Sequence, residues 1–248
     1  MNDSEILRMA QFEKEYWWHK GKVYLIKTFL DQYFPGRRDL NIMEIGCGTG
    51  GVTGFLTDYG AVTGVDTSHE AMYHVSQVGL KEAVVADVNE MDIDPYEKQF
   101  DLVLALDVLE HIQDDLETMR RVGMMLKPGG LFFINVPAYK FLWSEHDEAL
   151  LHKRRYHSYE LTKKLENCGY RILKSSYFVT FSFPGIVLYR LWGNLFGKTA
   201  YPKTTYVPLP KYLNDFMTNI LKFEANIVKR GRLPFGATLT VIAQPVTG

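Results

Sequence analysis

A glycine-rich turn between two apolar runs most constrains what this chain can fold into. The run 41–45 precedes the turn, and a second run, 61–65, follows it and ends at Asp66. The turn holds three glycines spaced two residues apart: Gly46, Gly48 and Gly50. A nucleotide-binding βαβ unit has the same order: a strand, a glycine turn, a helix, a second strand and an acid. Glycine allows a sharp turn and close approach of a ligand to the backbone, and Asp66 would accept hydrogen bonds from ribose hydroxyls.

Glu44 and the three glycines resemble the first motif of the class I S-adenosylmethionine (SAM) dependent methyltransferases, E-x-G-x-G-x-G. The resemblance implies that SAM is the cofactor and S-adenosylhomocysteine the product. A dinucleotide-binding dehydrogenase is the nearest alternative, because it also has a glycine-rich turn and a downstream acid.

Three later segments strengthen the resemblance. Members of this family carry F-D-x-[VI], then L-E-H, then K-P-G-G. This chain has the same order in Phe100-Asp101-Leu102-Val103, Leu109-Glu110-His111 and Lys127-Pro128-Gly129-Gly130. The resemblance covers residues 41–137. It implies an α/β fold: a Rossmann-like, seven-stranded and mostly parallel sheet of order 3-2-1-4-5-7-6, with helices on both faces.

The apolar pattern agrees with alternating strands and helices. Short runs rich in β-branched residues predict strands at 41–45, 61–65, 83–86, 100–106 and 130–136. Ser68 and Asp114 precede segments that we expect to be helical. Strands that are apolar on both sides indicate a parallel sheet covered by helices on both faces.

The resemblance implies which residues bind the cofactor. They are Glu44, Gly46, Cys47, Gly48, Gly50, Asp66, Thr67, Asp87, Val88 and Asp107. Asp87, at the end of the third strand, would accept a hydrogen bond from the adenine amino group. The alternative role for Asp87 is a helix N-cap.

The N-terminal residues 1–38 are expected to form a helical flap. Helices are predicted from Ser4 to about residue 14 and over 20–33, with Tyr16-Trp17-Trp18-His19 between them. These aromatic rings either fasten the helices to the domain or cover the cofactor and acceptor. Methyltransferases of quinone biosynthesis carry a similar Trp-Trp pair, which favours a flap with Trp18 and His19 at the substrate.

The loop after the fifth strand should border the acceptor, because ligands of open α/β sheets bind beyond the carboxyl ends of the strands. Within and beyond it, Tyr139, Trp143 and Phe183 are further candidate substrate contacts. Methyl transfer to a hydroxyl needs alignment and a base.

His146 is the first candidate for that base, with Asp147 as its orienting partner, and His111 is the second. Quinone-type O-methyltransferases have a His-Asp pair in the equivalent loop. The alternatives are a surface histidine at His146 and a structural contact at His111.

Asp107-x-x-Glu110-His111 is similar to an element that some quinone methyltransferases use with a divalent cation. On a helix, Glu110 and His111 would point about 100° apart, which disfavours a local chelate. The prediction is therefore a site without metal ligands.

The C-terminal part departs from the minimal fold. Strands at 170–178 and 237–243 are separated by an insertion, 179–235, so the cofactor-binding core comprises 39–178 and 236–248 of a single domain, 1–248. A predicted helix at 211–230 places Leu213, Phe216, Met217, Ile220, Ile227 and Val228 on one face. The insertion either forms a lid or dimer contact, or shelters a lipophilic acceptor and rests on a membrane surface.

Composition narrows the partners and compartment. The formal net charge is −1 and the longest basic run is Lys153-Arg154-Arg155, which argues against nucleic acid as a partner. Cys47 and Cys168 are the only cysteines and the N-terminus lacks an apolar signal core, so we expect a reducing, cytoplasmic location. The predicted function is O-methylation of a lipophilic or aromatic small molecule. The alternatives are C- or N-methylation, and a SAM- or NAD-binding protein without transferase activity.

Overall fold

The computed structural model describes residues 15–196 and 209–246. They contain a seven-stranded sheet of order β3-β2-β1-β4-β5-β7-β6, which confirms the predicted fold. The strands are β1 (Leu40–Ile45), β2 (Gly60–Asp66), β3 (Glu82–Val85), β4 (Phe100–Leu106), β5 (Leu126–Pro137), β6 (Tyr170–Phe178) and β7 (Thr238–Pro245). Strands β1 to β5 run parallel to one another, and β7 runs antiparallel between β5 and β6.

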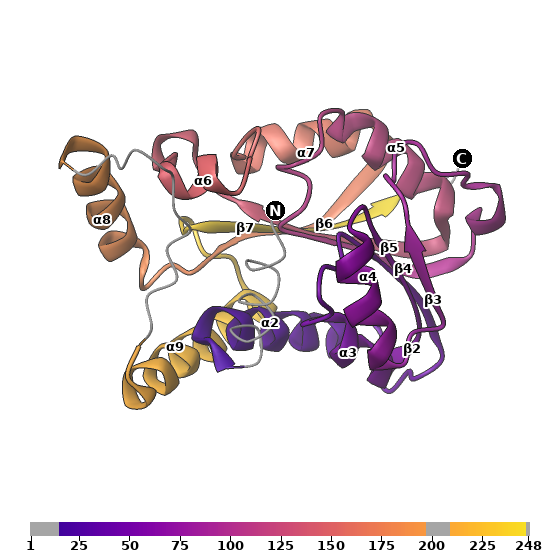
Figure 1. Ribbon diagram of the computed structural model, residues 1–248, viewed down its shortest axis with the longest axis horizontal. Helices are drawn as coiled ribbons and strands as arrows, with labels where there is room; N and C mark the ends of the chain where they lie inside the picture. The colour runs from indigo at the N-terminus through magenta and orange to yellow at the C-terminus, as the bar shows by residue number, and fades with distance from the viewer. Residues whose placement is uncertain (1–14, 197–208, 247–248) are drawn as a thin grey trace.

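Helices cover both faces of the sheet (Figure 1). The α-helices are α2 (Trp17–Tyr33), α3 (Thr53–Leu56), α4 (His69–Val75), α5 (Asp115–Met125), α6 (Glu145–Ala149), α7 (Ser158–Asn167), α8 (Phe183–Phe196) and α9 (Lys211–Arg230). Short 3-10 helices are η1 (Thr57–Tyr59), η2 (Ser76–Val78), η3 (Asp94–Tyr96) and η4 (Lys140–Leu142). The helix expected over residues 4–14 lies outside the described residues.

Two apolar cores lie on the two faces of the sheet because successive side chains of a strand point to opposite sides. Val103 of β4 packs with α5 and α7 on one face, and Leu102 and Leu104 pack with α2 and α9 on the other. All of β4 is buried, as expected for a central parallel strand. The side chains of Ser68 and Asp114 accept hydrogen bonds from the first turns of α4 and α5, so both predicted helix starts are confirmed.

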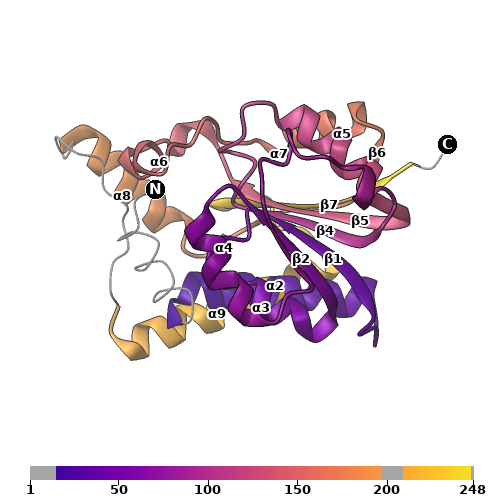
Figure 2. The ribbon, with the colours of Figure 1, turned by 45° about the vertical axis from the view of Figure 1, so that its right-hand side comes forward.

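The two helices of the insertion lie apart from each other (Figure 2). Helix α9 packs along α2, where Leu221 fills the space left by Gly21, and the Asn214 side chain accepts a hydrogen bond from the Trp17 backbone at 2.9 Å. Helix α8 contacts η4 and lies beside α6 (Figure 1). The predicted apolar face of α9 is partly wrong, because Phe216 is exposed while Leu221 is buried.

Candidate active site

A cleft of about 1350 Å³ runs across the carboxyl ends of the parallel strands. The loops after β1, β2 and β4 line one part of it, and α2, α6, α8 and α9 line the other. This volume exceeds the roughly 300–1,000 Å³ of an ordinary small-ligand site. The cleft therefore has room for a cofactor and a second ligand.

The glycine turn forms the floor of the cofactor part. Gly46 has φ +68°, and a Cβ there would lie 2.4 Å from Cγ2 of Val108, so a side chain would clash with the β4 loop. Gly48 has φ +53° and nothing within 4 Å of a Cβ position, which leaves the backbone open to a ligand. The buried Glu44 carboxylate accepts a hydrogen bond from the Thr53 hydroxyl at 2.6 Å and so ties the turn to α3.

Asp66 holds the same turn from the end of β2. Its Oδ2 accepts the Gly48 N–H and its Oδ1 accepts the Ser68 N–H, both at 2.9 Å. Each carboxylate oxygen can accept a second hydrogen bond, so the pair can still receive two ribose hydroxyls.

The other predicted cofactor residues fall into two groups. Cys47, Thr67, Asp87, Val88 and Asp107 line the cleft. Gly50 does not, and its φ of +91° shows that it serves the turn itself. Burial raises the pKa of the Cys47 thiol, so this sulfur is an apolar wall rather than a nucleophile. Asp87 accepts the Asn89 N–H at 2.8 Å, but residues 88–90 form a turn and not a helix, so the alternative role of a helix N-cap is wrong. Its carboxylate can still accept further hydrogen bonds.

Asp107 connects the cofactor loops to the N-terminal helix. It has φ +55°, and its carboxylate accepts hydrogen bonds from Lys22 Nζ and Asn135 Nδ2, each at 2.9 Å. Sequence reasoning missed Lys22. The signal available was its position one turn after Trp18 and His19, which puts the three residues near one another on α2. All three line the cleft.

Asp147 organises the acceptor part of the cleft. Its Oδ1 lies 2.8 Å from His152 Nδ1 and accepts a hydrogen bond from Arg155 Nε at 2.7 Å. Its Oδ2 accepts from Arg190 Nη1 of α8 at 3.0 Å. Burial alone would raise the pKa of Asp147, but the His152 hydrogen bond and both guanidinium charges hold it well below its usual range. Sequence reasoning paired Asp147 with its neighbour His146, and missed His152, Arg155 and Arg190.

An ionised Asp147 fixes the orientation of the His152 ring. A carboxylate only accepts hydrogen bonds, so Nδ1 of His152 donates to Asp147 and Nε2 is directed elsewhere. Nε2 lies 4.0 Å from Oε1 of Glu110. His152 thus has the arrangement of a base held in one tautomer by a buried acid.

The two predicted bases, His146 and His111, also line the cleft beside His152. The His111 and His152 rings are 4.7 Å apart between centroids, and the His146 and His152 rings are 6.5 Å apart. Burial lowers the pKa of both His111 and His146 to about 4. The charge of His152 lowers the pKa of His111 further, and the charge of Arg190 lowers that of His146. Both rings are therefore neutral near pH 7.

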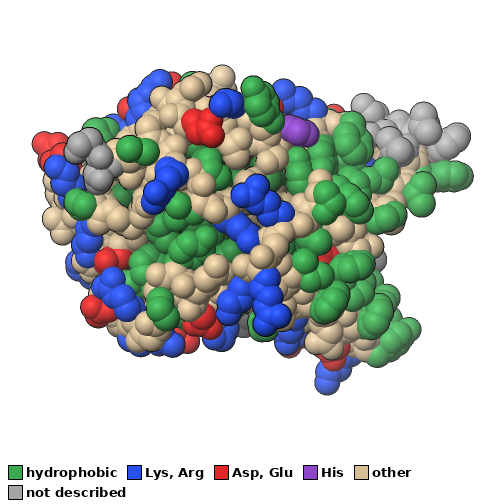
Figure 3. Space-filling view, turned by 180° about the vertical axis from the view of Figure 1, so that it is seen from behind, with side chains coloured by type: hydrophobic (Ala, Val, Ile, Leu, Met, Phe, Trp, Pro, Cys, Tyr) green, Lys and Arg blue, Asp and Glu red, His purple; other side chains and the backbone are tan. Residues whose placement is uncertain are grey.

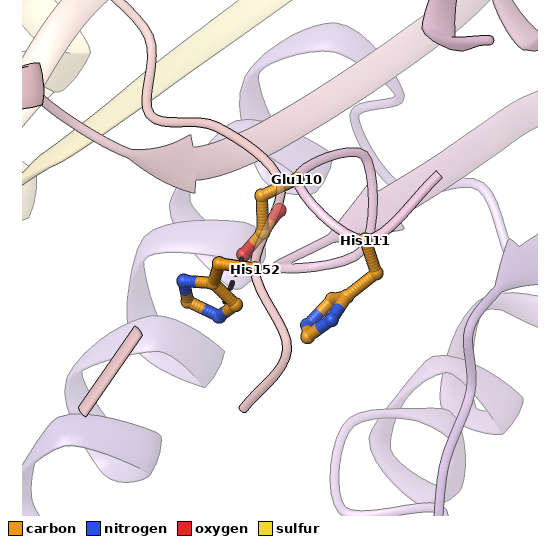
Figure 4. A group of neighbouring side chains, drawn as sticks. All are labelled: Glu110, His111 and His152. Atoms are coloured by element: carbon orange, nitrogen blue, oxygen red, sulfur yellow. Dashed lines mark ion pairs between the residues drawn. The ribbon is translucent and has the colours of Figure 1, made fainter. Parts of the chain in front are cut away.

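Glu110, His111 and His152 form a group that could hold a divalent cation (Figure 4). One ligand atom from each lies within 4.8 Å of the others. Glu110 is fully buried, and within the described part of the chain its Oε2 has no hydrogen-bond partner. Burial, followed by the negative charge of Asp107, raises the pKa of Glu110 well above the usual range. Asp107, the first residue of the predicted element, instead pairs with Lys22.

The aromatic residues predicted to touch the substrate fall into two groups. Trp18 and His19 line the cleft, whereas Tyr139, Trp143 and Phe183 are not among its lining residues. Tyr139 stacks on Tyr177 of β6, with ring centroids 4.9 Å apart, and lies 5.7 Å from the Phe183 ring. This aromatic group fastens the start of α8 to the sheet.

No helix within residues 15–196 and 209–246 combines the length and apolarity that crossing a membrane requires.

Comparison with known proteins identifies the family of this chain. A family model described as a methyltransferase domain matches residues 17–174. The ubiquinone biosynthesis O-methyltransferase of Shewanella pealeana is 28% identical over 149 residues, which cover 54% of this chain and 63% of that protein. The protein of the same name from Coxiella burnetii is 26% identical over 196 residues, covering 70% of this chain and 84% of that one. The chain thus spans less than two thirds of the length of the Shewanella relative.

Solved structures share the fold at low identity. A chain from the complex of the Haloferax volcanii Trm112 methyltransferase activator with a methyltransferase has a TM-score of 0.64 and 19% identity, covering 99% of this chain and 96% of that one. A SAM-dependent methyltransferase from Thermotoga maritima has a TM-score of 0.61 and 13% identity, covering 98% and 96%. Phosphoethanolamine N-methyltransferase 2 of Haemonchus contortus, in complex with SAM, has a TM-score of 0.57 and 18% identity, covering 90% and 53%.

Proposed function

Since this chain belongs to the methyltransferase-domain family, with SAM as cofactor, we propose that it methylates a hydroxyl group of a lipophilic or aromatic small molecule. The observation that carries the choice of a hydroxyl is the Asp147–His152 pair in the acceptor part of the cleft. A hydroxyl must lose its proton to become a good nucleophile, and a neutral imidazole is suited to take it near pH 7. The resemblance to ubiquinone biosynthesis O-methyltransferases supports the same choice.

The chain's own residues would act in three ways. Bound SAM supplies an electrophilic methyl group on a sulfonium. Asp66 would hold the ribose and the glycine turn would pass under the cofactor, which fixes the direction of approach. Nε2 of His152 would take the acceptor proton, and Asp147 would stabilise the imidazolium that forms. His146 and His111 are proposed to contact the acceptor from the same side of the cleft.

The lipophilic character of the acceptor is inferred from the walls of the cleft. Trp18 of α2, Ile186 and Tyr189 of α8 and Met217 of α9 line its outer part. Apolar and aromatic side chains on these walls suit a ring or an alkyl chain, while the histidines deeper in the cleft supply its polar groups. A lipophilic acceptor partitions into membranes, so peripheral membrane contact belongs to this proposal.

The acceptor class can be tested directly. Purified protein is incubated with SAM and a panel of catechols and phenols with alkyl chains of increasing length, together with alkylamines of matched length, and products are identified by mass spectrometry. We expect O-methylated catechols, formed faster as the chain lengthens. Methylated amines with no methylated phenol or catechol would contradict the proposal and favour N-methylation.

Cofactor binding has its own test, which needs no acceptor. S-adenosylhomocysteine should raise the melting temperature of the protein and NAD should not, because a ligand stabilises the state that binds it. Asp66→Ala should lose most of this shift, since both ribose hydroxyls lose their acceptor. Asp58→Ala, in η1 and outside the lining of the cleft, is the control. An unchanged shift in Asp66→Ala would refute the ribose assignment.

A further inference from the structure

The insertion exposes large apolar side chains on both of its helices. On α8, Leu188 is 70% exposed and Trp192 69%, with Tyr189 also exposed. On α9, Tyr212 is 77% exposed, Phe216 60% and Phe223 58%. We call these six residues the apolar rim. Figure 3, seen from behind, shows hydrophobic side chains gathered on the right-hand side, which carries α8 and α9, with a hollow between its two parts.

The rim residues of α9 lie away from the side of the helix that packs on α2, and Phe223 contacts Phe181, with ring centroids 6.1 Å apart. Tyr212, Phe216 and Phe223 follow one another at four and seven residues, so they share one side of the helix. A different side, with Leu221, faces α2 and is buried. Single exposed apolar residues are common, but a gathered set of aromatics marks an interaction surface.

The rim borders the mouth of the cleft. Tyr189 belongs to both, and Ile186 and Met217, which line the cleft, are close in sequence to Leu188 and Phe216. Arg190 points inward instead, to Asp147, and so holds this part of α8 against the acceptor site. Whatever covers the rim therefore lies against the entrance through which an acceptor reaches His152.

Charge indicates the kind of partner. Residues 167–248 contain ten Lys and Arg but only two acids, Asp215 and Glu224, a net charge of +8. The whole chain carries −1, so residues 1–166 carry −9. Glu224 is buried and accepts the backbone N–H groups of Thr180 and Phe181, so it adds no exposed negative charge. The part of the chain that bears the apolar rim is basic, while the rest is acidic.

We propose that the apolar rim docks on the surface of an anionic lipid bilayer. Trp, Tyr and Phe side chains would enter the interfacial region, and neighbouring cations such as Lys211 would face the lipid phosphates. Lys and Arg side chains near an anionic surface strengthen such binding electrostatically. The mouth of the cleft would then face the bilayer, and a lipophilic acceptor would enter without crossing water. This inference rests on the proposed function.

A second copy of the chain is the competing occupant of the rim. Two such surfaces brought together would both be basic, and like charges repel. The bilayer is favoured because it supplies negative charge and an apolar interior together.

The test is sedimentation of the full chain with vesicles, in the presence of S-adenosylhomocysteine and without any acceptor. We expect binding to phosphatidylcholine vesicles that contain one third phosphatidylglycerol, weaker binding to pure phosphatidylcholine, and further weakening as salt is raised. The double variant Leu188→Ser/Phe216→Ser should lose about tenfold or more of the vesicle affinity. It should keep its S-adenosylhomocysteine-induced melting shift, because neither residue lines the cleft. Tyr73→Ser, equally exposed but on α4, is the matched control.

Three outcomes would overturn the inference. They are equal binding to neutral and anionic vesicles, full vesicle binding by the double variant, and a dimer without lipid that the double variant converts to a monomer. Vesicle binding can be measured without an acceptor. If no catechol is methylated but the protein still binds vesicles through the apolar rim, only the proposed substrate class is rejected.

Discussion

Oδ1 of Asp147 lies 2.8 Å from Nδ1 of His152, on the far side of the short turn that follows α6. Both side chains are almost fully buried, and Arg155 and Arg190 neutralise the carboxylate from two other segments of the chain. The pair is therefore held by contacts from the loop after β5 and from the inserted helix α8. This relationship makes the insertion part of the proposed acceptor site.

His152→Gln should lower kcat by about 10²- to 10⁴-fold, because the general base is lost while Asp147 keeps its two arginines. The measurement is steady-state methylation of the best catechol over a range of pH. The wild-type rate should fall at low pH because a general base must be unprotonated to accept a proton, and the variant should lose this dependence. His146→Gln is the comparison, and it should retain more activity.

If His146→Gln loses as much activity as His152→Gln, and the pH dependence survives only in the His152 variant, His146 is the base and the assignment is wrong. Asp147→Asn is a poorer probe. It leaves two buried guanidinium groups without a counter-charge, which can destabilise the fold by about 3–5 kcal/mol.

Zinc should inhibit the enzyme without being needed for it. His152 Nε2, His111 and Glu110 are close enough to bind Zn²⁺, and bound zinc would occupy the lone pair that accepts the acceptor proton. We expect full activity in the presence of a chelator, inhibition by added Zn²⁺, and weaker inhibition in Glu110→Gln. Loss of activity with the chelator, restored by a divalent cation, would instead make the three residues a functional metal site.

The sheet order was predicted from the resemblance to a known family, and the glycine turn and Asp66 were placed together from the sequence because their positions are set locally. The turn at Gly46 and Gly48 and the acid Asp66 each follow a strand directly, so neighbouring residues fix where they lie. Other contacts of the cleft join distant segments of the chain. Arg190 reaches Asp147 across 43 positions and Lys22 reaches Asp107 across 85, and no periodicity relates such residues. Adjacency suggested His146 as the partner of Asp147, whereas the chain turns back to bring His152 to it.

Gly46→Ala should destabilise the protein far more than Gly36→Ala. Both positions have φ near +70°, so both substitutions carry a left-handed penalty of about 1–2 kcal/mol. Only at Gly46 would the new methyl group meet another side chain, at 2.4 Å from Val108, which adds about 1–3 kcal/mol of overpacking. Urea unfolding measures both losses. Val108→Ala should restore part of the stability in the Gly46 variant, and equal losses at the two glycines would contradict the contact.

His19 should make the protein less stable in mild acid. Burial, followed by the positive charge of Lys22, lowers the pKa of His19 from 6.5 to about 3. Between these values the unfolded chain binds a proton that the folded protein does not, so stability falls as the pH drops below 6.5. One such group contributes a slope of at most about 1.4 kcal/mol per pH unit. His19→Gln should remove that slope. Urea unfolding just below pH 6.5 should therefore show that the free energy of unfolding of the variant declines less steeply with falling pH than that of the wild type. His69→Gln, at an exposed position, should decline like the wild type. If His19→Gln declines as steeply as the wild type, His19 is already protonated in the folded state and is not buried as a neutral ring.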